Sequence, residues 1–288
     1  MTHFVAVCGI SLYLVVTVLQ LAQLWRPTKA GRRWRISSIA FISAFILHTV
    51  TLLLVVRDPQ MRALENGADY FLWVSWAIAA VYLAFRRWFD YPLLGAFITP
   101  AVVLFMGSSS YLLHQGAPSL IDPNVAIAAG ETAHTGLAVS LLHGVPALVA
   151  VVSVVLALAV SVVFLIVERR LKRRSSLSLE SGGLNLQLLD RLNSHLVKIG
   201  FVALSLVIVS GGLWAVMRRE AIFSLDTSVV SGLVLWALLA AILFARLVLA
   251  WSPKRLSRLT VLVTGGFILS VFLVLIVAGR MTHASLWS

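Results

Sequence analysis

Histidine is the residue type in this chain that is best suited to holding a metal or relaying a proton. One of the seven histidines, His48, stands inside the apolar stretch FISAFILHTVTLLLVV, residues 41–56. An imidazole without a partner in hydrocarbon leaves a polar nitrogen unsatisfied, which costs several kcal/mol. Ionisable groups inside membrane spans usually face other helices and mark functional sites. His48 is therefore a candidate ligand or proton relay, and its structural alternative is a hydrogen bond to a neighbouring helix.

The apolar setting of His48 extends over the whole chain. Of the 288 residues, 60% are hydrophobic and only 12% are charged, which is more apolar than the core of a soluble domain requires. The net charge of +12 comes from Lys and Arg clusters between apolar runs, a pattern typical of membrane topology determinants. The single cysteine, Cys8, cannot form an internal disulfide. We predict an integral membrane protein that binds no nucleic acid.

Apolar runs of the length that a membrane helix needs, about 20 residues, recur along the sequence. They predict an all-α, polytopic integral membrane helical bundle of about eight transmembrane helices, in a single domain over residues 1–288. The eight runs lie near 4–25, 37–56, 68–85, 92–113, 139–167, 196–217, 228–250 and 259–279. A polar segment rich in Ser and Gly predicts a flexible cytoplasmic loop at about 168–193.

The distribution of Lys and Arg predicts the orientation. With the loop after the first run on the inner side, 18 of the 23 Lys and Arg residues fall on that side. The positive-inside rule then places both termini on the outer side, which in a bacterium is the periplasmic face of the inner membrane. The five basic residues on the outer side are Arg57, Arg62, Arg218, Arg219 and Arg280.

Three histidines share the outer half of this predicted topology. His48 lies in the second run, His143 at the outer start of the fifth, and His283 just beyond the eighth. Each could ligate a metal or form a hydrogen bond to a neighbouring helix. The remaining four are better explained by a chain end, a solvated loop or the inner membrane surface: His3, His114, His134 and His195.

The surrounding residue types favour haem iron over other chemistry at these histidines. A catalytic zinc site usually has a carboxylate close by, as in HExxH, and the sequence has no such motif. The interiors of the runs contain no Asp or Glu, which disfavours an ion-coupled transporter of the usual kind. Haem needs one or two imidazoles, an apolar slot, aromatic faces and cations for its propionates.

The sequence offers aromatic faces and cations on the same outer side. Trp73, Trp76 and Trp214 could pack on a porphyrin, although each could equally belong to the interfacial aromatic belt. Cations for the propionates could come from the outer arginines, which could also extend to lipid phosphates. These arginines are Arg218, Arg219 and Arg280.

Several segments of the second half carry a family resemblance. LLHGVPALVA at 141–150, ERRLKRR at 168–174 and LDRLNSHLVKIGFVALSLVIVSGGLWA at 189–215, followed by two more apolar runs and a terminal His, resemble the cytochrome c assembly family. That family includes CcsA, CcmC and the smaller HemX-like and YpjD-like membrane proteins. The resemblance implies an α-helical protein that handles haem, with His143 and His283 as the favoured axial pair. His48 matches the histidine of the family's second span and would be a second site or an alternative ligand.

Two departures from the family pattern affect the expected function. The tryptophan-rich WWD loop of CcsA and CcmC is not present, and the segment after the sixth run reads FSLDTS at 223–228, where Asp226 alone matches the family's W-D-P-K-like pattern. These departures favour the HemX-like or YpjD-like branch over delivery of haem to apocytochrome.

Together these features predict a haem b-binding inner-membrane protein of haem trafficking or cytochrome c biogenesis, which is not an enzyme. Its expected partners are haem, the lipid bilayer and other cytochrome c maturation or haem-biosynthesis proteins. One alternative is a membrane regulator or scaffold of tetrapyrrole biosynthesis that acts through the inner loop. The other is a small-molecule transporter with structural histidines.

Overall fold

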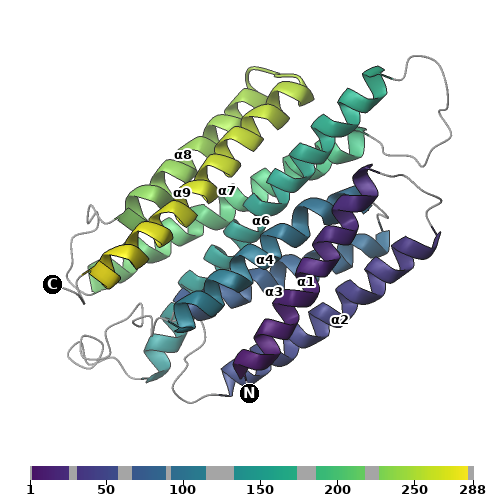
Figure 1. Cartoon of the computed structure of the whole chain (residues 1–288). Coiled ribbons are helices and arrows are strands. Elements are labelled where there is room, and N and C mark those ends of the chain that lie inside the picture. The colour runs from purple at the N-terminus through teal and green to yellow at the C-terminus, as the bar shows by residue number, and fades with distance from the viewer. Residues whose placement is uncertain are drawn as a thin grey trace. The chain divides into compact units, whose positions relative to one another are not determined.

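A computed structural model gives the arrangement of the helices (Figure 1). The structure describes the backbone of residues 2–25, 31–57, 67–88, 92–114, 133–173, 186–217 and 227–284. It describes the side chains of residues 4–22, 35–57, 69–86, 93–112, 141–172, 186–216 and 229–272.

The part of the chain that the structure describes is helical except for short connections such as residues 248–252, and it contains no strand. This confirms the predicted all-α class. The eight helices are α1 (Thr2–Trp25), α2 (Gly31–Val56), α3 (Gly67–Trp88), α4 (Pro92–His114), α6 (Ala133–Arg173), α7 (Leu186–Met217), α8 (Thr227–Leu247) and α9 (Pro253–Ala284).

Seven of these helices are long and apolar enough to cross a membrane, as expected of a multi-pass membrane protein. The helix outside this set is α3, whose described residues include Asp69 and Arg86 near its two ends. Charged residues lower the mean hydropathy of a segment, so the third predicted span stays a prediction. The orientation of the chain likewise stays a prediction.

The helices fall into two compact units. The first unit comprises Met1–Val152 and Ala203–Ser224, and the second comprises Ser153–Val202 and Leu225–Ser288. Helices α6 and α7 therefore contribute residues to both units. We predicted a single domain, and the continuity of these two helices is the feature that joins the units in sequence.

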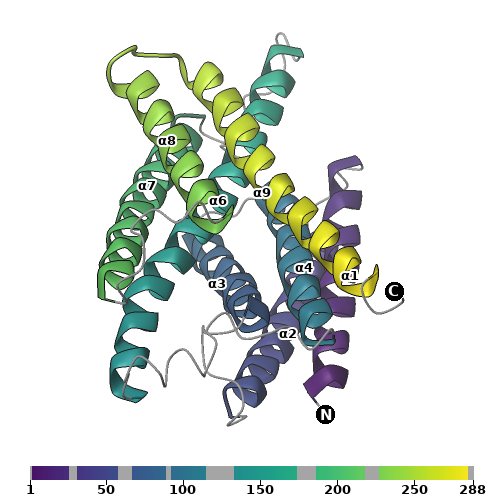
Figure 2. The ribbon, with the colours of Figure 1, turned by 90° about the vertical axis from the view of Figure 1, so that its left-hand side faces the viewer.

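The first unit is built on α1 to α4. Figures 1 and 2 show these helices side by side, and α1 packs against α2 and α4 while α3 packs against the same two. Phe41 of α2 lies between two tyrosines, with ring centroids 5.5 Å from Tyr13 and 5.0 Å from Tyr82. Both contacts are edge-on, the arrangement that aromatic quadrupoles prefer. The largest fully buried side chains of this core are Tyr13, Phe41, Ile78, Ile98 and Met106.

A close approach of helices in the first unit depends on Gly95 of α4. A Cβ atom there would lie 2.2 Å from the Tyr82 hydroxyl and 2.9 Å from both terminal amide atoms of Gln20. The amide oxygen of Gln20 accepts a hydrogen bond of 2.9 Å from Thr99 Oγ1. Gly95 thus leaves room for a buried polar cluster that joins α1, α3 and α4.

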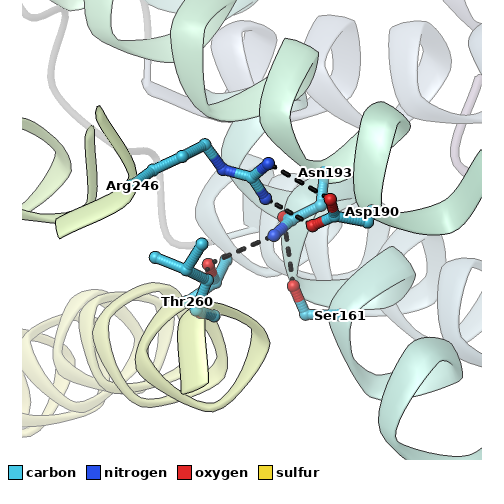
Figure 3. Close-up of polar contacts among 6 residues, drawn as sticks. Ser161, Asp190, Asn193, Arg246 and Thr260 are labelled. Carbon is cyan, nitrogen blue, oxygen red and sulfur yellow. Dashed lines mark hydrogen bonds and ion pairs between the residues drawn. The ribbon is translucent and has the colours of Figure 1, made fainter. Parts of the chain in front are cut away.

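The second unit contains polar links between its helices (Figure 3). The side-chain oxygen of Asn193 on α7 accepts a hydrogen bond of 3.1 Å from Ser161 of α6, and its amide nitrogen lies 3.5 Å from Thr260 of α9. Arg246 of α8 donates to both carboxylate oxygens of Asp190 on α7, at 3.2 and 2.5 Å. Buried polar groups with partners stabilise one arrangement of neighbouring helices.

The predicted loop at about 168–193 is shorter than expected, because α6 continues to Arg173 and α7 begins at Leu186. Glu168 on α6 pairs with Lys172 at 3.0 Å and with Lys254 of α9 at 2.9 Å. Paired charges allow a helix to continue beyond its apolar run, so hydropathy alone placed the end of α6 too early and the start of α7 too late. Residues 174–185 lie outside the described residues, and the flexibility of the loop stays a prediction.

Candidate functional site

His48 is placed at the centre of the first unit, with none of its surface exposed. Its Nε2 atom lies 3.2 Å from Oγ of Ser75 on α3. Ser75 also donates its hydroxyl proton to the carbonyl of Leu72, at 2.9 Å. With the single serine proton on the Leu72 carbonyl, the His48–Ser75 bond uses a proton on Nε2. This tautomer leaves a lone pair on Nδ1, which has no hydrogen-bond partner among the described residues.

Tyr13 of α1 is the aromatic neighbour of His48. The two rings meet edge-on, with centroids 5.9 Å apart. The Tyr13 hydroxyl is also buried without a hydrogen-bond partner in the described part of the chain. Leaving a polar atom buried and unpaired costs about 1–3 kcal/mol. Tyr13 and His48 thus form a buried pair whose polar atoms are only partly satisfied.

Trp73 and Trp76, predicted to pack on a porphyrin, have contacts within α3 and with α2. The indole nitrogen of Trp76 donates to Thr49 Oγ1 at 3.1 Å, and its ring stacks on Phe45 with centroids 5.7 Å apart. Trp73 meets Trp76 edge-on at 6.2 Å. These contacts account for Trp76 as a residue that packs α3 against α2.

His143 of α6 belongs to the same unit but to a different group of residues. Its Nδ1 atom lies 3.1 Å from Oγ of Ser210 on α7, and Ser210 donates to the carbonyl of Val207 at 3.1 Å. With the serine proton on the Val207 carbonyl, Nδ1 of His143 carries the shared proton and Nε2 keeps its lone pair.

The His143 ring lies against α7 on a second side as well. Trp214 meets it edge-on, with ring centroids 6.4 Å apart. A Cβ atom at Gly211 would lie 3.4 Å from Cε1 of the ring and 3.7 Å from Nδ1. Ser210, Gly211 and Trp214 thus form one surface that fixes how the half-buried imidazole is turned.

The remaining predicted site residues are not described at the level of side chains. His283 and Arg280 lie in the last turns of α9, within its bounds Pro253–Ala284, but their side chains are outside the described residues. Arg218 and Arg219 are outside the described residues altogether. The favoured pairing of His143 with His283 is therefore untested. Among the described side chains, no three His, Cys, Asp or Glu residues come together as a metal site.

Sequence comparison identifies the protein family of the chain. Residues 5–281 match the profile of the cytochrome C assembly protein family. The chain belongs to the cytochrome c assembly family. This confirms the resemblance and associates the protein with the haem-related steps of cytochrome c biogenesis. A search of curated proteins returns no match. The matched range includes His48 and His143 and ends just before His283.

The donor atoms of the two described histidines differ in their position on the ring and in their burial. Nε2 of His143 is at the tip of a half-buried ring. Nδ1 of His48 adjoins the ring's attachment to the backbone, and the whole residue is buried. The roles of both histidines as haem ligands stay predictions. Sequence reasoning missed Tyr13, Ser75 and Ser210, although each is a hydroxyl in an apolar run and so costly to bury unpaired.

Proposed function

We propose that this membrane protein handles haem during cytochrome c biogenesis, that it binds haem b through His143, and that it catalyses no reaction itself. The proposal includes membership of the HemX-like or YpjD-like branch and a place in the bacterial inner membrane. It rests on the family and on one observation, the His143 ring that contacts Ser210 through Nδ1 and meets Trp214 edge-on.

The residues around His143 would perform three tasks for a bound haem. The imidazole would donate its Nε2 lone pair to the iron. The haem iron would supply the colour and the redox chemistry of the bound haem. Trp214 of α7 would contact the edge of the porphyrin ring. Arg218 and Arg219 follow Trp214 by four and five residues in the sequence. Cations at this position would pair with propionates. His283 would supply the second imidazole.

His48 has a different task in this proposal. Its Nε2 proton is held by Ser75 and its ring by Tyr13, so it stabilises the packing of α1, α2 and α3. In this proposal His48 is a packing residue, whereas the family resemblance implied a second or alternative ligand of the iron. Other maturation proteins or haem-biosynthesis proteins would be the partners that give or receive the haem.

The test is the visible spectrum of the purified protein and its histidine variants. Wild type from haem-replete cells should show a Soret band, which His143→Ala and His283→Ala should reduce strongly. His48→Leu should keep it. His195→Ala is the matched control, because His195 is an exposed histidine of α7. A wild-type protein that stays colourless after haem addition would contradict the proposal and favour the transporter alternative.

A further inference from the structure

Ser210 lies where it could act on a bound haem iron through the side chain of His143. It is half-buried on α7, and its hydroxyl is the hydrogen-bond partner of His143 Nδ1 at 3.1 Å. We infer that Ser210 is a positioning residue for haem: it holds the Nδ1 proton of His143 so that the Nε2 lone pair points to the iron. This inference rests on the proposed function.

The direction of the hydrogen bonds supports this role. The carbonyl of Val207 lies 3.1 Å from the Ser210 hydroxyl, and with the serine proton directed there the serine oxygen accepts from the imidazole. A histidine that ligates a metal through one nitrogen usually donates the other N–H to a fixed acceptor, which sets the tautomer and the ring orientation. The Ser210 oxygen meets both requirements, because its own orientation is fixed by the helix.

The residues next to Ser210 limit rotation of the ring. Gly211 lies beneath Cε1 of His143, and Trp214 stands against the ring edge one turn further along α7. A flip of the ring would break the Nδ1–Ser210 bond. Residues 210, 211 and 214 of one helix therefore favour the observed orientation of the ring.

The acceptor also affects the iron electronically. Hydrogen bonding of the distal N–H of a ligating imidazole raises the basicity of the ligating nitrogen, and second-shell hydrogen bonds tune the reduction potential of haem. A serine oxygen that already donates its proton is a weaker acceptor than a carboxylate. We expect Ser210 to confer a moderate increase in basicity, which its removal would abolish.

The first test is a haem titration of the purified haem-free protein. Ser210→Ala should weaken haem affinity by about 10- to 100-fold, the usual effect of losing the hydrogen-bond partner of a metal ligand. It should also shift the reduction potential of the bound haem. Ser210→Thr keeps the oxygen and should restore both values. Ser270→Ala is the matched control, because Ser270 donates to its own helix carbonyl at 2.7 Å and is exposed.

The second test needs neither haem nor a variant. In the haem-free wild type, nitrogen-15 signals of the His143 ring should show a protonated Nδ1 and a bare Nε2. A proton on Nε2 would overturn the role of Ser210. Unchanged affinity and potential in Ser210→Ala would also overturn it. A wild type that binds no haem but shows the expected tautomer would contradict the proposed function while leaving the His143–Ser210 geometry intact.

Discussion

His48 and Ser75 are joined across α2 and α3 through Nε2 of the imidazole, whereas His143 and Ser210 are joined across α6 and α7 through Nδ1. In both pairs the serine gives its own proton to a carbonyl three residues earlier in its helix. The same interaction thus leaves opposite nitrogens open. Either nitrogen of a neutral imidazole can ligate a metal, so the proposed choice of His143 over His48 depends on the complete burial of His48.

Removing Ser75 alone should be more harmful than removing the whole pair. Ser75→Ala leaves the Nε2 proton of His48 buried without an acceptor and should lower the free energy of unfolding by about 1 kcal/mol. The double variant His48→Leu/Ser75→Ala replaces both polar groups by apolar ones and should be nearly neutral. Thermal unfolding in detergent measures both, and a double variant less stable than Ser75→Ala would contradict this account.

The orientation can be tested with a reporter that is active only outside the cytoplasm. Fusions after Pro118 and after Ser288 should be active, and a fusion after Ser178 should be inactive, because 18 of the 23 basic residues mark the inner side. An active fusion after Ser178 would reverse the topology and place His143 at the inner face.

Haem retention should depend on the outer arginines. If Arg218 and Arg219 pair with propionates, the double variant Arg218→Gln/Arg219→Gln should retain several-fold less haem with normal protein levels, because exposed charges contribute little to a buried helical core. Arg57→Gln is the control, since Arg57 is predicted on the same side but in another loop. Equal haem content in the double variant would assign Arg218 and Arg219 to lipid contacts.

Two glycines of α4 should respond oppositely to the same substitution. Gly95→Ala places a Cβ atom 2.2 Å from the Tyr82 hydroxyl and should destabilise the protein by about 1–3 kcal/mol through overpacking. Gly107 has nothing within 4 Å of such an atom, so Gly107→Ala should be neutral or stabilise by up to about 1 kcal/mol through helix propensity. Thermal midpoints compare the two variants, and equal effects would refute the close packing at Gly95.

The Arg246–Asp190 pair should show coupling in a double-mutant cycle. The two side chains are only 19% and 20% exposed, so removing one leaves a poorly solvated charge. Asp190→Asn and Arg246→Met should together cost about 1–2 kcal/mol less than the sum of their separate effects. Chemical unfolding of the four proteins measures this coupling, and strict additivity would show that the pair is merely adjacent.

The sequence predicted the helices well because seven of the eight in the described residues are apolar runs of bilayer length, and hydropathy measures that property directly. It was less accurate at the C-terminal end of α6 and the N-terminal end of α7, where Glu168 pairs with Lys254 and Asp190 with Arg246. These partners are 86 and 56 residues away. Pairing over such distances leaves no trace in a local pattern.

The candidate site was predicted in part. Residue type and topology identified His48 and His143 as unusual, and only the family resemblance favoured His143 over His48 as an axial ligand. What distinguishes them is which nitrogen meets a serine, and this depends on the rotation of α3 against α2 and of α7 against α6. Rotation about a helix axis is set by packing, so Ser75 and Ser210 could only be identified from the structure.

The division of α6 and α7 between the two units has a consequence for the order of biosynthesis. Chains are made and inserted from the N-terminus, and the two serine–histidine pairs close loops of different length, 27 residues for His48–Ser75 and 67 for His143–Ser210. The first pair can form once α3 has been made, whereas the second pair needs α7. A chain whose synthesis stops before α7 contains α1 to α4 but lacks Ser210. If His143 binds haem as proposed, only a chain whose synthesis is nearly complete would hold this imidazole in the orientation that Ser210 sets.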